Sequence, residues 1–165
     1  MSTYLITGAN RGIGLEYCRQ LKKRGDEVIA TSRSSSSELD KLGIRVEPSV
    51  DVTSEASINK LKTKLRDNKI DVLIQNAGIA ENNSLENHDI ASLRRQFEVN
   101  ALSPLSFTRS MLNNLREGSK VILMTSRMGS IEDNTSGGSY GYRMSKVALC
   151  MAGKSLSIDL KPCGI

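Results

Sequence analysis

The stretch Thr7-Gly8-Ala9-Asn10-Arg11-Gly12-Ile13-Gly14 decides the fold of this chain of 165 residues. It directly follows the short apolar run Tyr4-Leu5-Ile6, which predicts a buried strand, and apolar residues at helical spacing continue from it to near Gly25. A glycine-rich turn between a strand and a helix lets the backbone approach a phosphate, and the N-terminus of the helix offers unpaired N–H groups. The stretch therefore predicts an α/β fold that begins with a nucleotide-binding turn.

The glycines of this turn are spaced as TGxxxGxG, which differs from the GxGxxG of long dinucleotide folds. The alternative is a glycine-rich surface turn, which the position between a strand and a helix disfavours. We expect the turn to contact a nucleotide through Gly8, Asn10, Arg11, Gly12, Ile13 and Gly14.

Strand and helix patterns alternate along the rest of the chain. Strands are expected at residues 4–6, 27–31, 44–47, 72–74 and 121–124, and helices from Ile13 to near Gly25, at 38–42, after Thr53 as a cap, at 90–115 with a kink at Pro104, and at 142–160. This order predicts a doubly wound parallel sheet with helices on both faces, a three-layer α/β/α fold, in a single domain over residues 1–165.

The end of the second strand indicates which nucleotide is preferred. An acidic residue there would bind the ribose hydroxyls of NAD(H), but this chain has Thr31-Ser32-Arg33 instead. A guanidinium suits the 2′-phosphate of NADP(H), and Arg11 could reach the same phosphate, so NADP(H) is favoured over NAD(H). The alternative is that both arginines are merely solvated. Asp51, followed by Val52, stands after the third strand, where its carboxylate could accept a hydrogen bond from adenine.

Tyr142 and Lys146 are four residues apart and share one face of a helix. A nearby ammonium stabilises a phenolate, so such a phenol can donate a proton to a carbonyl oxygen. Taken alone, the two residues would be better interpreted as an exposed Tyr–Lys pair on a helix. The glycine turn earlier in the chain favours the catalytic interpretation instead. Tyr140 is a less suitable acid because the residue four positions later is Met144.

Two further polar residues are candidates for the same chemistry. Ser126 closes the fifth strand and could hydrogen-bond a substrate carbonyl. Asn100 precedes Pro104 in the long helix, where its amide could bind backbone freed by the kink or hold a water for a proton relay.

Composition excludes several other classes of protein. The net charge of +5 could suit nucleic acid, but the densest basic stretch, residues 60–69, has the pattern of a solvated helix face. No apolar run is long enough to span a membrane, and the N-terminus leaves no room for a signal peptide. Three scattered cysteines and one histidine, His88, argue against a metal site and a Ser-His-Asp hydrolase and fit a cytoplasmic protein.

The chain resembles the short-chain dehydrogenase/reductase family over its whole length, and within it the C-factor-like and sniffer-like carbonyl reductases. The matching pieces are TGANRGIG, the DVT at Asp51, the QNAG at residues 75–78, the region of Asn100, the serine Ser126 and YRMSK at residues 142–146. The resemblance implies a catalytic tetrad of Asn100, Ser126, Tyr142 and Lys146. It also implies that Tyr142 and Lys146 contact the cofactor, Lys146 at the nicotinamide ribose, that Asn76, Ala77 and Gly78 line the cofactor, and that the fold is a seven-stranded Rossmann-type sheet.

Two features depart from the family pattern. Gln75 replaces a more usual asparagine, and Ile165 stands where the sixth strand should begin, so we expect a fold that lacks the family's last strands. The leading hypothesis is an NADP(H)-dependent oxidoreductase that acts on a small-molecule carbonyl or secondary alcohol. The alternative is a cofactor-binding signalling or regulatory protein with little turnover. The two long helices are also candidates for a homodimer or homotetramer interface.

Overall fold

The computed structural model describes residues 1–87 and 89–165, so His88, on which the hydrolase alternative depends, lies outside the described residues. Five parallel strands form one sheet in the order β3-β2-β1-β4-β5. The strands are β1 (Thr3–Thr7), β2 (Glu27–Thr31), β3 (Arg45–Glu47), β4 (Val72–Gln75) and β5 (Lys120–Leu123). The α-helices are α1 (Gly12–Arg24), α2 (Ser37–Asp40), α3 (Glu55–Lys64), α4 (Ile90–Phe97), α5 (Ser103–Met111) and α6 (Tyr140–Asp159). Short helical turns are η1 (Glu98–Leu102), η2 (Leu112–Asn114), η3 (Arg127–Gly129) and η4 (Lys161–Cys163).

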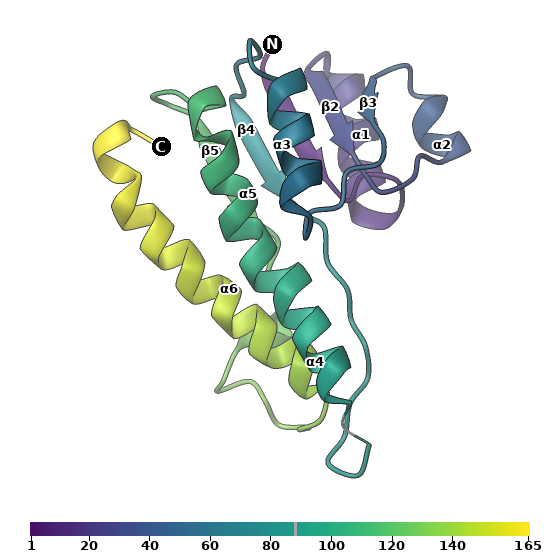
Figure 1. Ribbon diagram of the computed structural model, residues 1–165, viewed down its shortest axis with the longest axis vertical. Helices are drawn as coiled ribbons and strands as arrows, with labels where there is room; N and C mark the ends of the chain where they lie inside the picture. Colours follow the sequence, from purple (N-terminus) through teal and green to yellow (C-terminus); the bar gives the residue numbers. More distant parts are fainter. Residues whose placement is uncertain (88) are drawn as a thin grey trace.

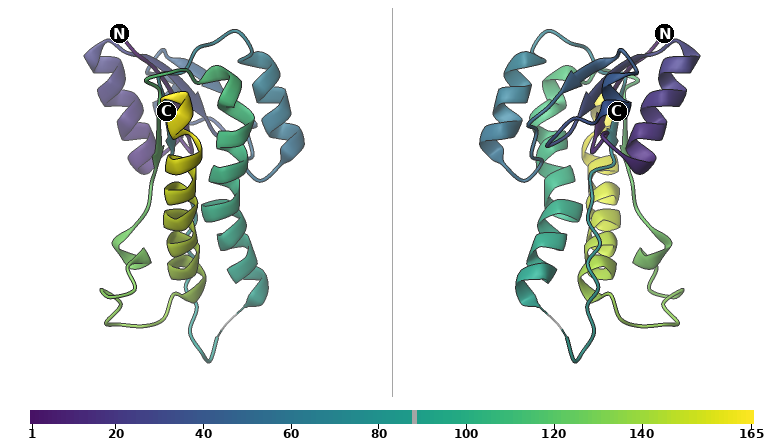
Figure 2. Two further views of the ribbon diagram at one scale, coloured as in Figure 1. Left: turned by 90° about the vertical axis from the view of Figure 1, so that its left-hand side faces the viewer. Right: turned by 90° about the vertical axis from the view of Figure 1, so that its right-hand side faces the viewer.

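The helices cover both faces of the sheet, which confirms the predicted three-layer α/β/α fold (Figures 1 and 2). Helix α1 lies on one face, and α3, α5 and α6 lie on the other. The chain winds outward from β1 to β3 and then returns to start β4 on the other side of β1. This reversal creates a crevice at the carboxyl ends of β1 and β4, where ligands bind in open parallel sheets.

Successive side chains of the strands point to opposite faces of the sheet and contribute to two hydrophobic cores. Leu5 and Leu73 belong to the core under α3 and α5, together with Phe107. Ile6 and Ile74 belong to the core under α1. All five side chains are essentially excluded from solvent. The sheet is therefore buried on both faces, as expected of parallel strands.

The long helix predicted at residues 90–115 is interrupted by a π-helical turn rather than simply kinked at Pro104. The N–H of Ser103 donates to the carbonyl of Glu98, five residues back, in η1. Proline has no N–H to continue the ladder of i→i−4 bonds, and η1 ends at Leu102, two residues before Pro104. Asn100 therefore sits inside the irregular turn.

Smaller differences concern the helix ends. Ser54, rather than Thr53, caps α3, and its Oγ accepts from the Ser57 N–H at 3.3 Å. Helix α6 begins at Tyr140, two residues before the predicted start.

Helix α4 and the first turns of α6 extend past the carboxyl edge of the sheet and lie side by side (Figures 1 and 2). Strand β5 stands at one edge of the sheet and pairs, among the described residues, with β4. Within the described part of the chain, no helix combines the length and apolar character that crossing a membrane requires.

Candidate active site

The glycine turn is held against the end of β4. The Asn76 side-chain amide donates to the carbonyls of Thr7 at 3.1 Å and Gly8 at 3.0 Å. A Cβ on Gly14 would collide with the Gly8 carbonyl and lie 2.5 Å from that same amide nitrogen. A Cβ on Gly8 would lie 2.8 Å from the Ala77 backbone, and the φ angle of Gly8 is +65°. Both positions therefore require glycine.

Thr7 joins the two strands that flank the crevice. Its buried hydroxyl accepts from the backbone N–H groups of Asn76 and Ala77, each at 3.1 Å. The glycine turn after β1 and the segment after β4 are thus fixed to each other.

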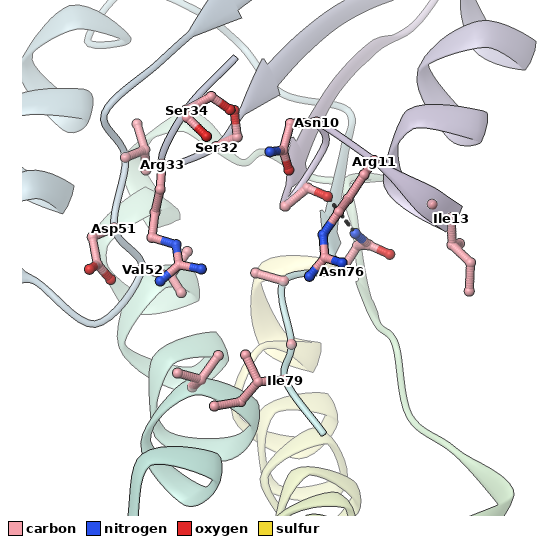
Figure 3. Close-up of a pocket in the computed structure, with 16 residues that line it drawn as sticks. Asn10, Arg11, Ile13, Ser32, Arg33, Ser34, Asp51, Val52, Asn76 and Ile79 are labelled. Carbon is pink, nitrogen blue, oxygen red and sulfur yellow. Dashed lines mark hydrogen bonds between the residues drawn. The ribbon is translucent and has the colours of Figure 1, made fainter. Parts of the chain in front are cut away.

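A cavity of about 390 Å³ opens at this crevice (Figure 3). The residues that line it are Gly8, Asn10, Arg11, Gly12, Ile13, Ser32, Arg33, Ser34, Val50, Asp51, Val52, Asn76, Ala77, Gly78, Ile79 and Val99. All the residues predicted to bind a nucleotide therefore line it except three. Gly14 packs behind the turn, and Tyr142 and Lys146 stand outside the lining.

The cavity carries positive charge and one carboxylate. The guanidinium groups of Arg11 and Arg33 project into it from opposite sides (Figure 3), and neither forms an ion pair with a described carboxylate. The pKa of the Asp51 carboxyl lies below its ordinary value because the Thr53 N–H and hydroxyl donate to it, and Arg33 adds to the effect. One Asp51 oxygen is thus already engaged by Thr53.

This geometry fits a phosphorylated dinucleotide. The glycines leave the backbone bare where a phosphate would approach α1, and two unpaired guanidinium groups can each bind a phosphate oxygen. The described residues contain no cluster of three or more His, Cys, Asp or Glu side chains that could hold a metal ion.

Lys146 is 5% exposed, and its Nζ donates to the Met124 carbonyl at 2.7 Å. Burial lowers the pKa of this ammonium from its ordinary value of 10.5, while the nearby Cys150 acts in the opposite direction. The Nζ lies 5.6 Å from the centre of the Tyr142 ring. The predicted pairing of Tyr142 and Lys146 on one helix face is therefore present. An ammonium has three donors, and Met124 takes one of them.

Asn100 connects the cavity to this pair. Its amide accepts from the Ile79 N–H at 2.9 Å and donates to the Ile79 carbonyl at 2.8 Å and to Ser145 Oγ at 3.0 Å. The amide therefore binds backbone after β4 rather than the helix backbone near Pro104. A Cβ on Gly78 would lie 3.2 Å from Asn100 Oδ1 and 3.8 Å from Lys146 Nζ. Gly78, which lines the cavity, thus lies between Asn100 and Lys146.

Ser126 approaches the same end of α6. It follows β5 by three residues and caps η3, with its Oγ accepting from the Met128 N–H at 3.2 Å. The next turn packs directly on α6, because a Cβ on Gly129 would lie 3.0 Å from Lys146 Cβ. The four predicted catalytic residues therefore come from η1, the β5–η3 connection and α6.

Sequence reasoning missed some residues of this region. Ile79 and Val99 line the cavity, and Ser145 bonds to Asn100 while its Oγ donates to the Tyr142 carbonyl at 2.7 Å. The position of Ser145 inside YRMSK could have indicated its role beside Tyr142. Nothing in the sequence distinguishes Val99 from an ordinary helix residue.

The chain resembles known proteins over its whole length. A family model described as short chain dehydrogenase matches residues 2–165. A 1-hydroxy-2-glutathionyl-2-methyl-3-butene dehydrogenase of Rhodococcus is 42% identical over all of this chain and 74% of its own length. The C-signal protein of Myxococcus xanthus is 51% identical over 58% of this chain and 59% of its own length.

Solved structures of related proteins also resemble this chain over its whole length. The carbonyl reductase Sniffer of D. melanogaster superposes with a TM-score of 0.91 and 31% identity over all of this chain and 77% of its own. An NADPH-bound carbonyl reductase from chicken fatty liver superposes with a TM-score of 0.85 and 26% identity over all of this chain and 76% of its own.

Proposed function

Because the chain belongs to the short-chain dehydrogenase family, whose members are oxidoreductases that use nicotinamide cofactors, we propose that it is an NADP(H)-dependent carbonyl reductase. The substrate is a small-molecule ketone or aldehyde in one direction and the corresponding alcohol in the other. Bound NADPH would supply the hydride. The chain's own residues bind and orient the reactants and supply the proton.

In this proposal, Tyr142 donates a proton to the carbonyl oxygen of the substrate. Lys146 stabilises the phenolate left on Tyr142, since its ammonium lies on the same helix face, and it contacts the cofactor ribose with a remaining N–H. Ser126 donates its hydroxyl hydrogen to the same carbonyl oxygen. Asn100 holds Ile79 and Ser145, so it keeps the cavity and α6 at a fixed separation.

One observation carries the proposal: Gly78 lines the cavity, and a Cβ on Gly78 would lie 3.2 Å from Asn100 Oδ1 and 3.8 Å from Lys146 Nζ. A nucleotide cradle by itself would suit many binding proteins. Here a residue of the cradle lies beside Lys146, whose Nζ is 5.6 Å from the centre of the Tyr142 ring, and a phenol next to an ammonium is the pair that carbonyl reduction needs.

Replacing Tyr142 by Phe tests the proposal directly. We expect Tyr142→Phe to lose at least ~100-fold in kcat, because general acid catalysis contributes about that much, while NADPH affinity stays within a factor of three. Tyr140→Phe, two residues away, is the matched control and should keep its activity. Equal turnover in Tyr142→Phe and the parent chain would contradict the assignment.

The preference for NADP(H) rests on Arg33 and Arg11 and on the absence of a carboxylate at the end of β2. The NADPH bound to the chicken carbonyl reductase supports the same choice. Asp51, with one oxygen held by Thr53, is placed in the proposal at the adenine amino group.

A second candidate function is cofactor-dependent signalling with little turnover. The 51% identity to the C-signal protein favours it. It predicts saturable NADPH binding without oxidation of NADPH by any member of a carbonyl panel. Robust turnover by this chain would rule it out.

We further propose a single cofactor-binding domain in a reducing, cytoplasmic setting. The three free cysteines Cys18, Cys150 and Cys163 support a compartment without disulfides. A homodimer or homotetramer would form through the α4–α5 and α6 helices.

A further inference from the structure

A buried amide in α4 lies at the centre of a polar network that the proposed chemistry does not use. Gln96 is fully buried. Its Oε1 accepts from the Glu81 N–H at 3.0 Å, and its Nε2 donates to Asn83 Oδ1 at 3.0 Å, to the Glu81 carbonyl at 3.2 Å and to Ser92 Oγ at 3.3 Å. Since an unsatisfied buried amide is costly, this satisfied network holds the segment at Glu81–Asn83 in one position.

The network reaches the first turn of α6 through two independent contacts. The Asn83 carbonyl accepts from the Ser139 N–H at 2.8 Å, and Ser139, which precedes α6, has a left-handed φ of +47°. Gly141 is buried against the same group, because a Cβ there would lie 2.6 Å from Gln96 Nε2 and 3.1 Å from Asn83 Oδ1. Gln96 thus sets how closely the start of α6 approaches α4.

Tyr142 directly follows Gly141. A shift of α6 by the radius of one methyl group would therefore move the phenol relative to Ser126 and the cavity. A misplacement of about 1 Å in a catalytic geometry can cost ~100-fold in rate.

We propose that Gln96 is a positioning residue: with Gly141 as its contact, it sets the place of the Tyr142 hydroxyl at the active site. The proposal rests on the proposed function, since it gives Tyr142 a proton to deliver. It assigns Gln96 no contact with substrate or cofactor, because Gln96 does not line the cavity.

A steric double-mutant cycle separates this role from general stability. Gly141→Ala forces a methyl against Gln96 Nε2. In the Gln96→Ala background the amide is gone, and the Asn83 side chain can turn into the vacated space. Gly153→Ala is the matched control, because it puts the same methyl on α6, 2.9 Å from the mobile end of Leu123 and 11 positions after Tyr142.

Two measurements are made on each variant. The first is kcat together with the dissociation constant for NADPH. The second is ¹⁹F NMR of the chain with 3-fluorotyrosine at its four tyrosines, in which the spectrum of Tyr142→Phe identifies the Tyr142 resonance. Fluorine reports the surroundings of the phenol whether or not the chain turns over.

We expect Gly141→Ala to displace the Tyr142 resonance and to lower kcat at least tenfold, with the NADPH dissociation constant within a factor of three of the parent. In the Gln96→Ala background, Gly141→Ala should have less than a threefold further effect on kcat. Gly153→Ala should resemble the parent in both measurements. If Gly141→Ala does not fold, Gln96→Ala alone decides, because it too should displace the resonance and lower kcat.

A Tyr142 resonance unmoved in both Gly141→Ala and Gln96→Ala would overturn the proposal, as would a displaced resonance with unchanged kcat. So would a loss of NADPH binding that equals the loss in kcat, since that would indicate general disruption. A parent chain without turnover would refute the proposed function alone, because the fluorine spectra still decide whether Gln96 sets the place of Tyr142.

Discussion

Arg33 is an exposed guanidinium at the end of β2 that forms no ion pair with a described carboxylate, so a phosphate does not have to compete for it. A charge-assisted hydrogen bond contributes about 1.5–3 kcal/mol. Arg33→Ala should therefore weaken NADPH binding roughly 10- to 100-fold. NADH binding should change less than threefold, because NADH lacks the 2′-phosphate. Isothermal titration with both nucleotides checks this.

The control for Arg33 is Arg127→Ala. Arg127 is also exposed, but it pairs with Asp133 at 2.9 Å and does not line the cavity. If Arg33→Ala weakened NADH and NADPH equally, the arginine would serve general attraction rather than recognition of the 2′-phosphate.

Lys146 links the site to the stability of the protein. Burial lowers the pKa of its ammonium below 10.5 in the folded state, so between the folded value and 10.5 the unfolded chain binds more protons. The free energy of unfolding therefore rises with pH in that interval, and the cost of burying the charge is fully present below it.

Lys146→Met removes this titration. We expect the stability of the parent relative to Lys146→Met to increase between pH ~8 and pH ~10, measured by urea unfolding at both values. A constant or falling difference would mean that the ammonium is not penalised by burial.

At the scale of the elements, the turn between β1 and α1 depends on two glycines for different reasons. A Cβ on Gly14 would meet the Gly8 carbonyl and the Asn76 amide, whereas a Cβ on Gly12 would meet nothing within 4 Å. Gly14→Ala should cost about 1–3 kcal/mol and abolish nucleotide binding, because the turn must move. Gly12→Ala should cost only about 1–2 kcal/mol for its φ of +55° and retain measurable NADPH binding.

Urea unfolding and NADPH titration of the two alanine variants check the comparison. A Gly14→Ala variant that bound NADPH as tightly as Gly12→Ala would show that the turn tolerates displacement from Asn76.

Periodicity and glycine placement were enough to predict the elements and the cavity. The apolar runs at Tyr4-Leu5-Ile6 and residues 72–74 became neighbouring strands, and Gly8, Arg33, Asp51 and Asn76, named after the first four strands, line one cavity. The π-helical turn was not predictable, because Pro104 signals an irregularity but not its hydrogen bonding. The partners of Gln96 and Asn100 were not predictable either. Gln96 meets Glu81, 15 positions away, through the packing of the segment after β4 on α4, and Asn100 meets Ser145, 45 positions away, through the packing of η1 on α6.

For the whole molecule, the position of the site follows from the strand order. Strands β1 and β4 are neighbours in the sheet, but the chain leaves β1 toward β2 and leaves β4 toward β5, in opposite directions along the sheet. The crevice between the ends of the two strands therefore stays open. The long α4–α5 and α6 helices extend beyond that edge and carry Asn100, Tyr142 and Lys146 to it. The nucleotide cradle thus lies at the carboxyl edge of the sheet, and three of the four proposed catalytic residues lie on the two helices, with Ser126 on the β5–η3 connection.

These two helices also expose apolar side chains. Met144, Met151 and Ile158 are seven residues apart on α6 and are 45%, 68% and 58% exposed. Leu102 and Leu105, at the junction of η1 and α5, are 46% and 41% exposed. Exposed apolar side chains gathered on adjacent helices favour association of copies.

We therefore expect the chain to sediment as a dimer or tetramer at micromolar concentration and Met151→Glu to shift it toward monomer, because a carboxylate would lose its hydration in the interface. Ile13→Glu is the matched control, since Ile13 is 63% exposed on α1, on the opposite face of the sheet from α5 and α6. Sedimentation velocity over a hundredfold range of concentration measures the effect. A parent chain that is monomeric throughout would contradict the expected association, and an equal shift in both variants would place the interface elsewhere than on α6.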